Sequence, residues 1–354
     1  MIGTDLKQEK PEQVNRRRNR QDCGRKWGGG LNMTDGAAAN VSRDRMHELV
    51  TRILDNVTQV VLGKRDVAEQ CLVALLSGEH ILLEDVPGVG KTLMGKALAR
   101  SINGIFRRIQ FTPDLLPSDI VGSSLYKSNT SEFIFNEGPI FSNFVLADEI
   151  NRAPPRTQSA LLEAMSDRHV SVDGVTHALP VPFMVIATQN PYEFEGTYVL
   201  PESQMDRFLM RISMGYPGRE FERQILETHR EGEPVESLHA VCSAEELSTI
   251  QRAVRAVRVE SSISEYILDV VHATRDSSEL AFGVSTRGGL LWYRASQAWA
   301  FLQGRDYVIP DDAKRLAVSV HAHRVQLKGI FQAGMRQEAE EIIQRILAHV
   351  TVPV

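Results

Sequence analysis

A glycine-bearing turn between an apolar run and a lysine–threonine pair, in residues 81–92 (ILLEDVPGVGKT), constrains this chain more than any other feature. The apolar run predicts a buried strand, and Gly88 and Gly90 would let successive backbone N–H groups approach an anion. A helix that begins at Lys91 would direct its positive end at the same anion. The segment therefore predicts a phosphate-binding loop, although Asp85 replaces the first glycine of the general pattern G-x-x-x-x-G-K-[ST].

The residue types of this loop suit a nucleoside triphosphate. We expect Gly88, Val89 and Gly90 to line the phosphates and Lys91 to reach the β- and γ-phosphates. The hydroxyl of Thr92 would ligate Mg²⁺. ATP and Mg²⁺ are therefore the expected ligands.

Two further apolar runs, residues 144–148 and 183–188, predict buried strands that end in polar residues. The first ends at Asp148 and Glu149, which suit a Mg²⁺ contact and a base for an attacking water, respectively. Asn190 follows the second and can hold that water. Ligands of parallel α/β sheets bind at the carboxyl ends of the strands. A purely structural role is disfavoured, because adjacent carboxylates at a strand end are costly unless a cation compensates them.

Five longer segments resemble, in the same order, those of the MoxR family of AAA+ ATPases: residues 110–119 (QFTPDLLPSD), 137–141 (EGPIF), 146–156 (LADEINRAPPR), 187–191 (ATQNP) and 200–208 (LPESQMDRF). The likeness runs from about residue 43 to the C-terminus. It implies an α/β P-loop core, with a parallel sheet flanked by helices, followed by a smaller all-α lid domain. The family also tolerates an aspartate where Asp85 stands.

The resemblance implies further contacts to the nucleotide. In the family, the segment that holds Val61 and Gly63 lines the adenine pocket, although an ordinary helix–helix turn explains each residue equally well. Arg207 resembles an arginine finger that acts on the neighbouring subunit, with a salt bridge to Asp206 as the alternative. Arg152 is the rival for the finger.

The resemblance also points to the start of a lid helix near residue 285. Arg287 would there act as the second nucleotide sensor of the family. Relatives usually have other residues where Gly288 and Gly289 stand in this chain. Two glycines near a helix start cost up to ~1 kcal/mol each relative to alanine, which predicts a looser lid.

Periodicity and composition divide the chain into four parts. Residues 1–42 lack apolar periodicity, which predicts a disordered tail. We expect the core in residues 43–217, a linker in 218–242 and the helical lid in 243–354.

Within the core, residues 123–135 and 170–179 predict hairpins, the second with a type I′ turn at Asp173 and Gly174. The first resembles the family's helix 2 insertion, which would project toward the ring pore. In the lid, His321 and His323 are interpreted as packing or surface residues, and Trp292 and Trp299 as lid core.

Composition and charge limit the cellular compartments and the partners that we expect for this chain. The chain of 354 residues has a net charge of −5, and residues 1–30 carry eight Lys/Arg and four Asp/Glu. The basic tail predicts a solvated segment or a misplaced start, with a nucleic-acid-binding arm as a weaker alternative. No apolar run approaches the ~18–20 residues that a membrane-spanning helix needs. Three scattered cysteines, Cys23, Cys71 and Cys242, fit a reducing compartment, so we expect a cytoplasmic protein.

The resemblance implies Mg²⁺-dependent hydrolysis of ATP by a homo-oligomer, most simply a hexameric ring. Members act as chaperone-like motors that remodel or mature protein complexes, often with a partner that carries a von Willebrand factor A domain. A magnesium-chelatase-like ATPase subunit for metal insertion is the alternative among enzymes. A nucleic-acid motor or regulator is an alternative of another class. The acidic charge outside the tail and the lack of an evident helix-turn-helix motif disfavour it.

Overall fold

The computed structural model describes residues 42–129, 131–190, 197–228, 232–329 and 335–353. The predicted tail, residues 1–42, lies outside these ranges except for Ser42, which accepts a hydrogen bond from the Arg45 backbone N–H at the start of α1 (Arg43–Val60). Helix α1 buries Leu49, Val50, Ile53 and Leu54, which recur at helical spacing along one face. An amphipathic helix therefore opens the described part of the chain.

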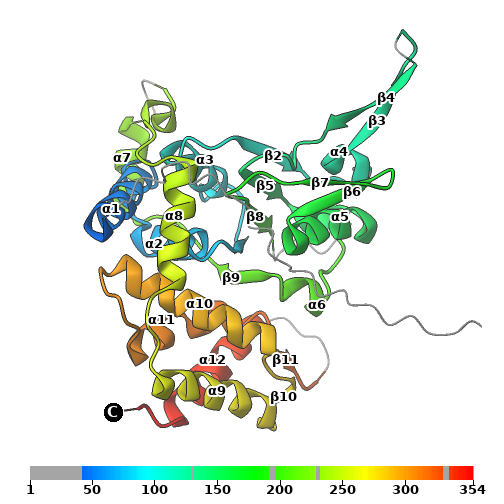
Figure 1. Cartoon of the computed structure of the whole chain (residues 1–354). Helices are drawn as coiled ribbons and strands as arrows, with labels where there is room; N and C mark the ends of the chain where they lie inside the picture. Colours follow the sequence, from blue (N-terminus) through cyan, green and yellow to red (C-terminus); the bar gives the residue numbers. More distant parts are fainter. Residues whose placement is uncertain (1–41, 130, 191–196, 229–231, 330–334, 354) are drawn as a thin grey trace, which may run out of the picture. The chain divides into compact units, whose positions relative to one another are not determined.

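A five-stranded parallel sheet forms the centre of the core (Figure 1). Its strands, in spatial order, are β2 (Phe106–Gln110), β5 (Phe144–Asp148), β8 (Met184–Gln189), β1 (His80–Glu84) and β9 (Phe208–Ile212). Strands β1 and β5 are buried along their whole length. Continuous apolar runs are typical of strands covered on both faces, and this agrees with the strands predicted at residues 81–83 and 144–148.

Side-chain alternation along the strands divides the core between the two faces of the sheet. Ile81 and Leu83 pack in one apolar cluster with helices α1, α2 (Arg65–Ser77) and α3 (Lys91–Ser101). Leu82 packs in a second cluster with helix α5 (Pro155–Asp167) and the strand residue Val145. The sheet is therefore flanked by helices, and the fold predicted for the core is confirmed.

Two hairpins accompany the sheet. Strands β3 (Gly122–Lys127) and β4 (Glu132–Glu137) follow helix α4 (Pro117–Val121) and extend as a long antiparallel arm (Figure 1). Strands β6 (His169–Val172) and β7 (Val175–Ala178) are joined through Asp173 and Gly174, with φ of 52° and 80°. Two positive φ angles are the signature of the predicted type I′ turn. The Phe135 and His177 rings stack at 4.1 Å between the two hairpins.

Short helices lie before and after β9. Helix α6 (Glu202–Met205) precedes β9, and helix α7 (Arg219–Thr228) and the 3₁₀ helix η2 (Pro234–Ser237) lie in the segment expected to be a linker.

The lid consists of helices α8 (Ala244–Arg255), α9 (Ser261–Asp276), α10 (Thr286–Leu302), α11 (Pro310–His321) and α12 (Met335–His349). Trp292, His321 and His323 are buried within it, as packing residues. The lid was expected to be all-α, but it also holds an antiparallel pair, β10 (Leu280–Phe282) with β11 (Gln326–Leu327). Strands this short cannot display a two-residue periodicity, so no pattern marked them.

Lid helices α10 and α11 pack against β9, the strand at one edge of the sheet. This contact covers an edge that would otherwise expose unpaired backbone groups. In the described parts of the chain, no helix combines the length and the apolar character needed to cross a membrane.

Candidate functional site

A cavity of ≈ 540 Å³ lies where strands β1, β5 and β8 end. Nine of the predicted site residues line it: Val61, Gly88, Val89, Gly90, Lys91, Thr92, Asp148, Glu149 and Asn190. They come from four segments that are far apart in the sequence, and the parallel sheet brings them to one edge. This is the position that the strand order predicts for a ligand site.

The glycine-bearing loop has a left-handed backbone at two of its glycines. Gly88 and Gly90 have φ of +83° and +96°, a left-handed conformation that side chains beyond glycine rarely adopt. A Cβ on Gly88 would meet no atom within 4 Å, so backbone conformation and access, not packing, explain glycine there. Helix α3 begins directly afterwards at Lys91, so its first backbone N–H groups face the cavity.

Asp85 replaces the expected first glycine because it anchors the loop. Its Oδ2 accepts hydrogen bonds from Gly215 N at 2.6 Å and Ser213 Oγ at 2.9 Å, and its Oδ1 accepts one from Val86 N at 2.8 Å. Burial opposes the charged form, but these hydrogen bonds outweigh it and lower the pKa of Asp85. The carboxylate thus ties the start of the loop to the segment after β9, which a glycine could not do.

The Asp148 carboxylate is fixed by groups on both neighbouring strands. Its Oδ2 accepts hydrogen bonds from Arg108 Nε at 3.0 Å and Nη2 at 2.6 Å, and its Oδ1 accepts one from Thr188 Oγ1 at 2.5 Å. Thr188 Oγ1 also accepts a hydrogen bond from Glu149 N at 2.9 Å. Asp148 is therefore held as a charged, oriented group at the cavity wall.

Glu149 occupies an unusual backbone position. Its φ of 57° is left-handed, which is uncommon for a residue with a side chain and recurs at functional sites. Its Oε2 accepts a hydrogen bond from Gln110 Nε2 at 2.8 Å and pairs with Arg152 Nε at 3.3 Å. Arg152, the rival for the arginine finger, thus contacts the carboxylate of its own protomer.

Three polar residues at this site were not selected from the sequence: Arg108, Gln110 and Thr188. Arg108 and Gln110 lie two apart on β2, so both point to the same face, and Gln110 is the register partner of Asp148. That alternation was the available signal. Thr188 is part of the ATQNP motif, directly before Gln189 and Asn190, but nothing in the sequence set it apart as a hydrogen-bond partner of Asp148.

Gly63, Arg207 and Arg287 are not among the residues that line the cavity. Gly63 has φ of +71°, and a Cβ there would lie 2.4 Å from the Phe221 ring, so backbone conformation and packing both require glycine. Its neighbours Val61 and Leu62 do line the cavity.

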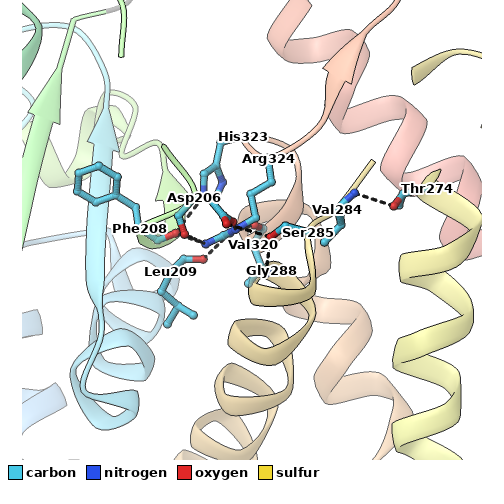
Figure 2. Close-up of polar contacts among 10 residues, drawn as sticks. All are labelled: Asp206, Phe208, Leu209, Thr274, Val284, Ser285, Gly288, Val320, His323 and Arg324. Carbon is cyan, nitrogen blue, oxygen red and sulfur yellow. Dashed lines mark hydrogen bonds and ion pairs between the residues drawn. The ribbon is translucent and has the colours of Figure 1, made fainter. Parts of the chain in front are cut away.

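Two of the predicted site residues, Arg207 as the finger and Arg287 as the sensor, have other surroundings than the cavity wall. The Arg207 guanidinium donates a hydrogen bond to the Leu162 carbonyl of α5, while Asp206 pairs instead with Arg324 of the lid at 2.8 Å. Arg287 is exposed on the first turn of α10. Ser285 caps this helix by accepting a hydrogen bond from Gly288 N at 3.0 Å (Figure 2).

The start of α10 is packed more closely than its two glycines suggested. A Cβ on Gly288 would lie 2.7 Å from Val284 Cγ1 and 3.0 Å from Arg324 Cδ. Glycine at position 288 therefore allows Val284 and Arg324 to approach α10 closely. The looser lid stays a prediction.

Comparison with known proteins places this geometry in a family. A family model described as "ATPase family associated with various cellular activities (AAA)" matches residues 80–210, and one described as "AAA lid domain" matches residues 272–346. The chain is 49% identical over 314 residues to the protein YeaC of Bacillus subtilis, covering 88% of this chain and 97% of that protein. It is 43% identical over 329 residues to "Chaperone MoxR1" of Mycobacterium tuberculosis, covering 90% and 85%. A crystal structure from Cytophaga hutchinsonii is similar with a TM-score of 0.80 and 37% identity, covering 88% and 97%.

Proposed function

Because the chain belongs to the MoxR family of AAA+ ATPases, we propose that it hydrolyses ATP with Mg²⁺ and thereby remodels or matures partner protein complexes. One observation carries the proposal: the cavity collects a loop with left-handed glycines, a lysine, a hydroxyl and two carboxylates at one edge of the sheet. This set matches what phosphoryl transfer needs, namely donors for the phosphates, oxygen ligands for a cation and a base.

The residues of the cavity fit Mg²⁺. The Thr92 hydroxyl and the Asp148 carboxylate both line it, and hard oxygen donors are the ligands that this ion prefers. The Asp148 carboxylate already faces a positive group, because Arg108 Nη2 lies 2.6 Å from it. When bound, the ion would offset negative charge on the phosphates.

The chain's own groups would carry out the remaining steps. The backbone N–H groups of the loop and the Lys91 ammonium bind the phosphate oxygens. Glu149 accepts a proton from the attacking water, and Gln110 holds the carboxylate in place. Asn190 orients the same water. No group of the described chain needs to form a covalent intermediate.

We further propose that the active form is a hexameric ring. Arg207 would offset the charge developing at the γ-phosphate of the adjacent protomer, and Arg287 would couple the lid to the nucleotide state. A protein with a von Willebrand factor A domain is the proposed partner, in the cytoplasm. A magnesium-chelatase-like role would instead require a porphyrin-binding partner subunit.

The test compares two variants of the purified protein. Lys91→Ala should lose binding of a fluorescent ATP analogue, because it removes the counter-charge of the phosphates. Glu149→Gln should keep that binding and lose phosphate release, because only the base is gone. Equal loss of nucleotide affinity in both variants would contradict these roles, and wild-type protein with no Mg²⁺-dependent phosphate release would contradict the proposed function.

The cellular role needs a second experiment. Glu149→Gln should retain ATP and so hold its partner long enough for affinity capture and identification. Lys91→Ala is the matched control, since it should capture nothing that depends on nucleotide. Stimulation of the wild-type ATPase by single- or double-stranded nucleic acid would favour the nucleic-acid motor instead.

A further inference from the structure

Arg324, which follows helix α11 of the lid, makes a set of contacts to the core segment 206–209 (Figure 2). Its Nε donates to Asp206 Oδ1 at 2.8 Å and its Nη2 to the carbonyls of Phe208 and, at 3.4 Å, Asp206. Its Nη1 donates to the Leu209 carbonyl at 3.0 Å and to the Val320 carbonyl. A guanidinium has five N–H donors, and five oxygen atoms receive them here.

This arrangement is costly if its purpose is stability alone. The Arg324 side chain is 1% exposed. Burial lowers the pKa of Arg324 to about 10, and the Asp206 carboxylate opposes that shift, so the group stays charged at neutral pH. Replacing a buried ion pair by apolar residues is often neutral or stabilising. Apolar residues cannot fix the orientation of the segment that they contact, whereas five oriented hydrogen bonds can.

Four of the five acceptors of Arg324 flank Arg207 on both sides. The Asp206 carboxylate and carbonyl precede Arg207, and the Phe208 and Leu209 carbonyls follow it. The backbone that carries Arg207 is therefore attached to the lid immediately before and immediately after this residue.

The same contacts reach the start of α10. The second carboxylate oxygen of Asp206 accepts a hydrogen bond from Ser285 Oγ at 2.9 Å, and Ser285 is the N-cap of α10, the helix that carries Arg287 (Figure 2). Val284 N donates to Thr274 Oγ1 at 2.9 Å, which fixes the chain entering this cap. Gly288 then leaves the room that the stem of Arg324 occupies.

We infer that Arg324 is a positioning residue: through Asp206 and the backbone of residues 206–209 it fixes the direction in which a protomer presents Arg207, and through Ser285 it links that direction to the lid helix of Arg287. The inference rests on the proposed ATPase function. It predicts a specific kind of defect. Neither Arg324 nor Asp206 lines the nucleotide cavity, so their loss should lower turnover while leaving nucleotide affinity of the protomer almost unchanged.

The first measurement separates kcat from ATP affinity. Asp206→Asn keeps the size of the side chain and removes its charge, and Arg324→Lys keeps the charge but cannot reproduce the planar fork. Both should lower kcat at least ~10-fold, since a finger can supply ~10³–10⁵ in rate, with less than about a threefold change in the Kd of an ATP analogue. Arg305→Lys is the matched control, because Arg305 makes a two-pronged pair with Asp312 inside the lid, at 2.7 and 2.5 Å. It should leave both constants unchanged.

A mixing experiment tests whether the defect lies in how a protomer presents Arg207 to its neighbour. Asp206→Asn protomers mixed with Glu149→Gln protomers should regain activity, because the former keep an intact Glu149 and the latter an intact Arg207 segment. The two variants Arg305→Lys and Asp206→Asn are compared at equal melting temperatures. If both lose the same amount of kcat, general packing of the lid explains the defect and the inference is overturned.

A second readout does not depend on hydrolysis. A nitroxide label attached to Arg207→Cys, in a Cys23→Ser background, should become more mobile when Asp206→Asn is added and stay unchanged when Arg305→Lys is added. Cys71 and Cys242 are buried and should not react, which unlabelled Cys23→Ser protein checks. If the wild type does not hydrolyse ATP, the proposed function fails and label mobility still decides the positioning role. Unchanged mobility in the well-folded Asp206→Asn protein would overturn it.

Discussion

His80 shows how a single buried side chain can report on folding. It lies at the start of β1, where its Nδ1 accepts a hydrogen bond from Val185 N at 2.9 Å and its Nε2 contacts the Met165 carbonyl at 3.0 Å. The neutral ring with a proton on Nε2 satisfies both partners, whereas a proton on Nδ1 would face the Val185 N–H. Burial is the main cause that lowers the pKa of His80 from 6.5 to about 4.

This pKa predicts an acid-sensitive fold. The unfolded chain binds a proton near pH 6.5 and the native protein only near pH 4, so the stability contributed by neutral His80 is present above pH 6.5 and lost as the pH falls toward 4. Between pH 7 and pH 5 the free energy of unfolding should fall by roughly 2 kcal/mol from this residue. In denaturant titrations, His80→Gln should show a shallower fall.

Two other buried histidines should also contribute to the pH dependence of the free energy of unfolding. Burial also lowers the pKa values of His321 and His323 well below 6.5, so part of the pH dependence should persist in His80→Gln. A variant with the same slope as the wild type between pH 7 and pH 5 would show that His80 titrates normally in the native protein.

At the scale of elements, the first turn of α10 gives a test with a built-in control. Gly288→Ala should gain up to ~1 kcal/mol of helix propensity, but its Cβ would lie 2.7 Å from Val284 Cγ1, and overpacking of this kind costs typically ~1–3 kcal/mol. At Gly289 the nearest atom, Val271 Cγ2, would be 3.4 Å away.

We therefore expect opposite outcomes from neighbouring positions. Gly288→Ala should lower the midpoint of chemical denaturation, and Gly289→Ala should leave it unchanged or raise it. If both variants are stabilised, α10 has room at Gly288 and the close contact with Arg324 is not formed in solution.

The elements differ in how far the sequence predicted them. The loop at residues 85–92 and the acids at Asp148 and Glu149 were predictable because each motif is local and its chemistry allows few substitutes. The contact between Arg324 and Asp206 joins residues 118 apart, and the Asp85 contact with Gly215 joins residues 130 apart. Such pairings follow from tertiary packing, which no local pattern encodes. The same holds for the two-residue strand β11.

At the scale of the whole molecule, the proposed ring makes a prediction about Arg207. Arg207→Ala protomers keep a complete cavity and lack only the charge offered to a neighbour, whereas Glu149→Gln protomers can still offer it. Each variant alone should be nearly inactive. Equal mixtures that exchange subunits should regain phosphate release, because a finger worth ~10³–10⁵ in rate makes even a few repaired interfaces measurable.

Co-assembly of the two variants has to be shown separately, for example with distinct affinity tags. Mixtures that co-assemble and stay inactive would mean that Arg207 acts within its own protomer. Arg152, which lines up beside Glu149 at 3.3 Å, would then be the candidate for the finger.

Strand β9 is held at both ends by side chains from elsewhere in the fold: Arg324 binds the residues at its start, and Asp85 binds Ser213 and Gly215 just beyond its end. A five-residue extended strand spans roughly 16 Å and cannot lengthen. It therefore acts as a spacer of constant length between the glycine-bearing loop and Arg207, the proposed arginine finger. A shift of the loop can reach Arg207 only if the whole strand moves as a rigid body, and the lid packed on its edge must then move with it.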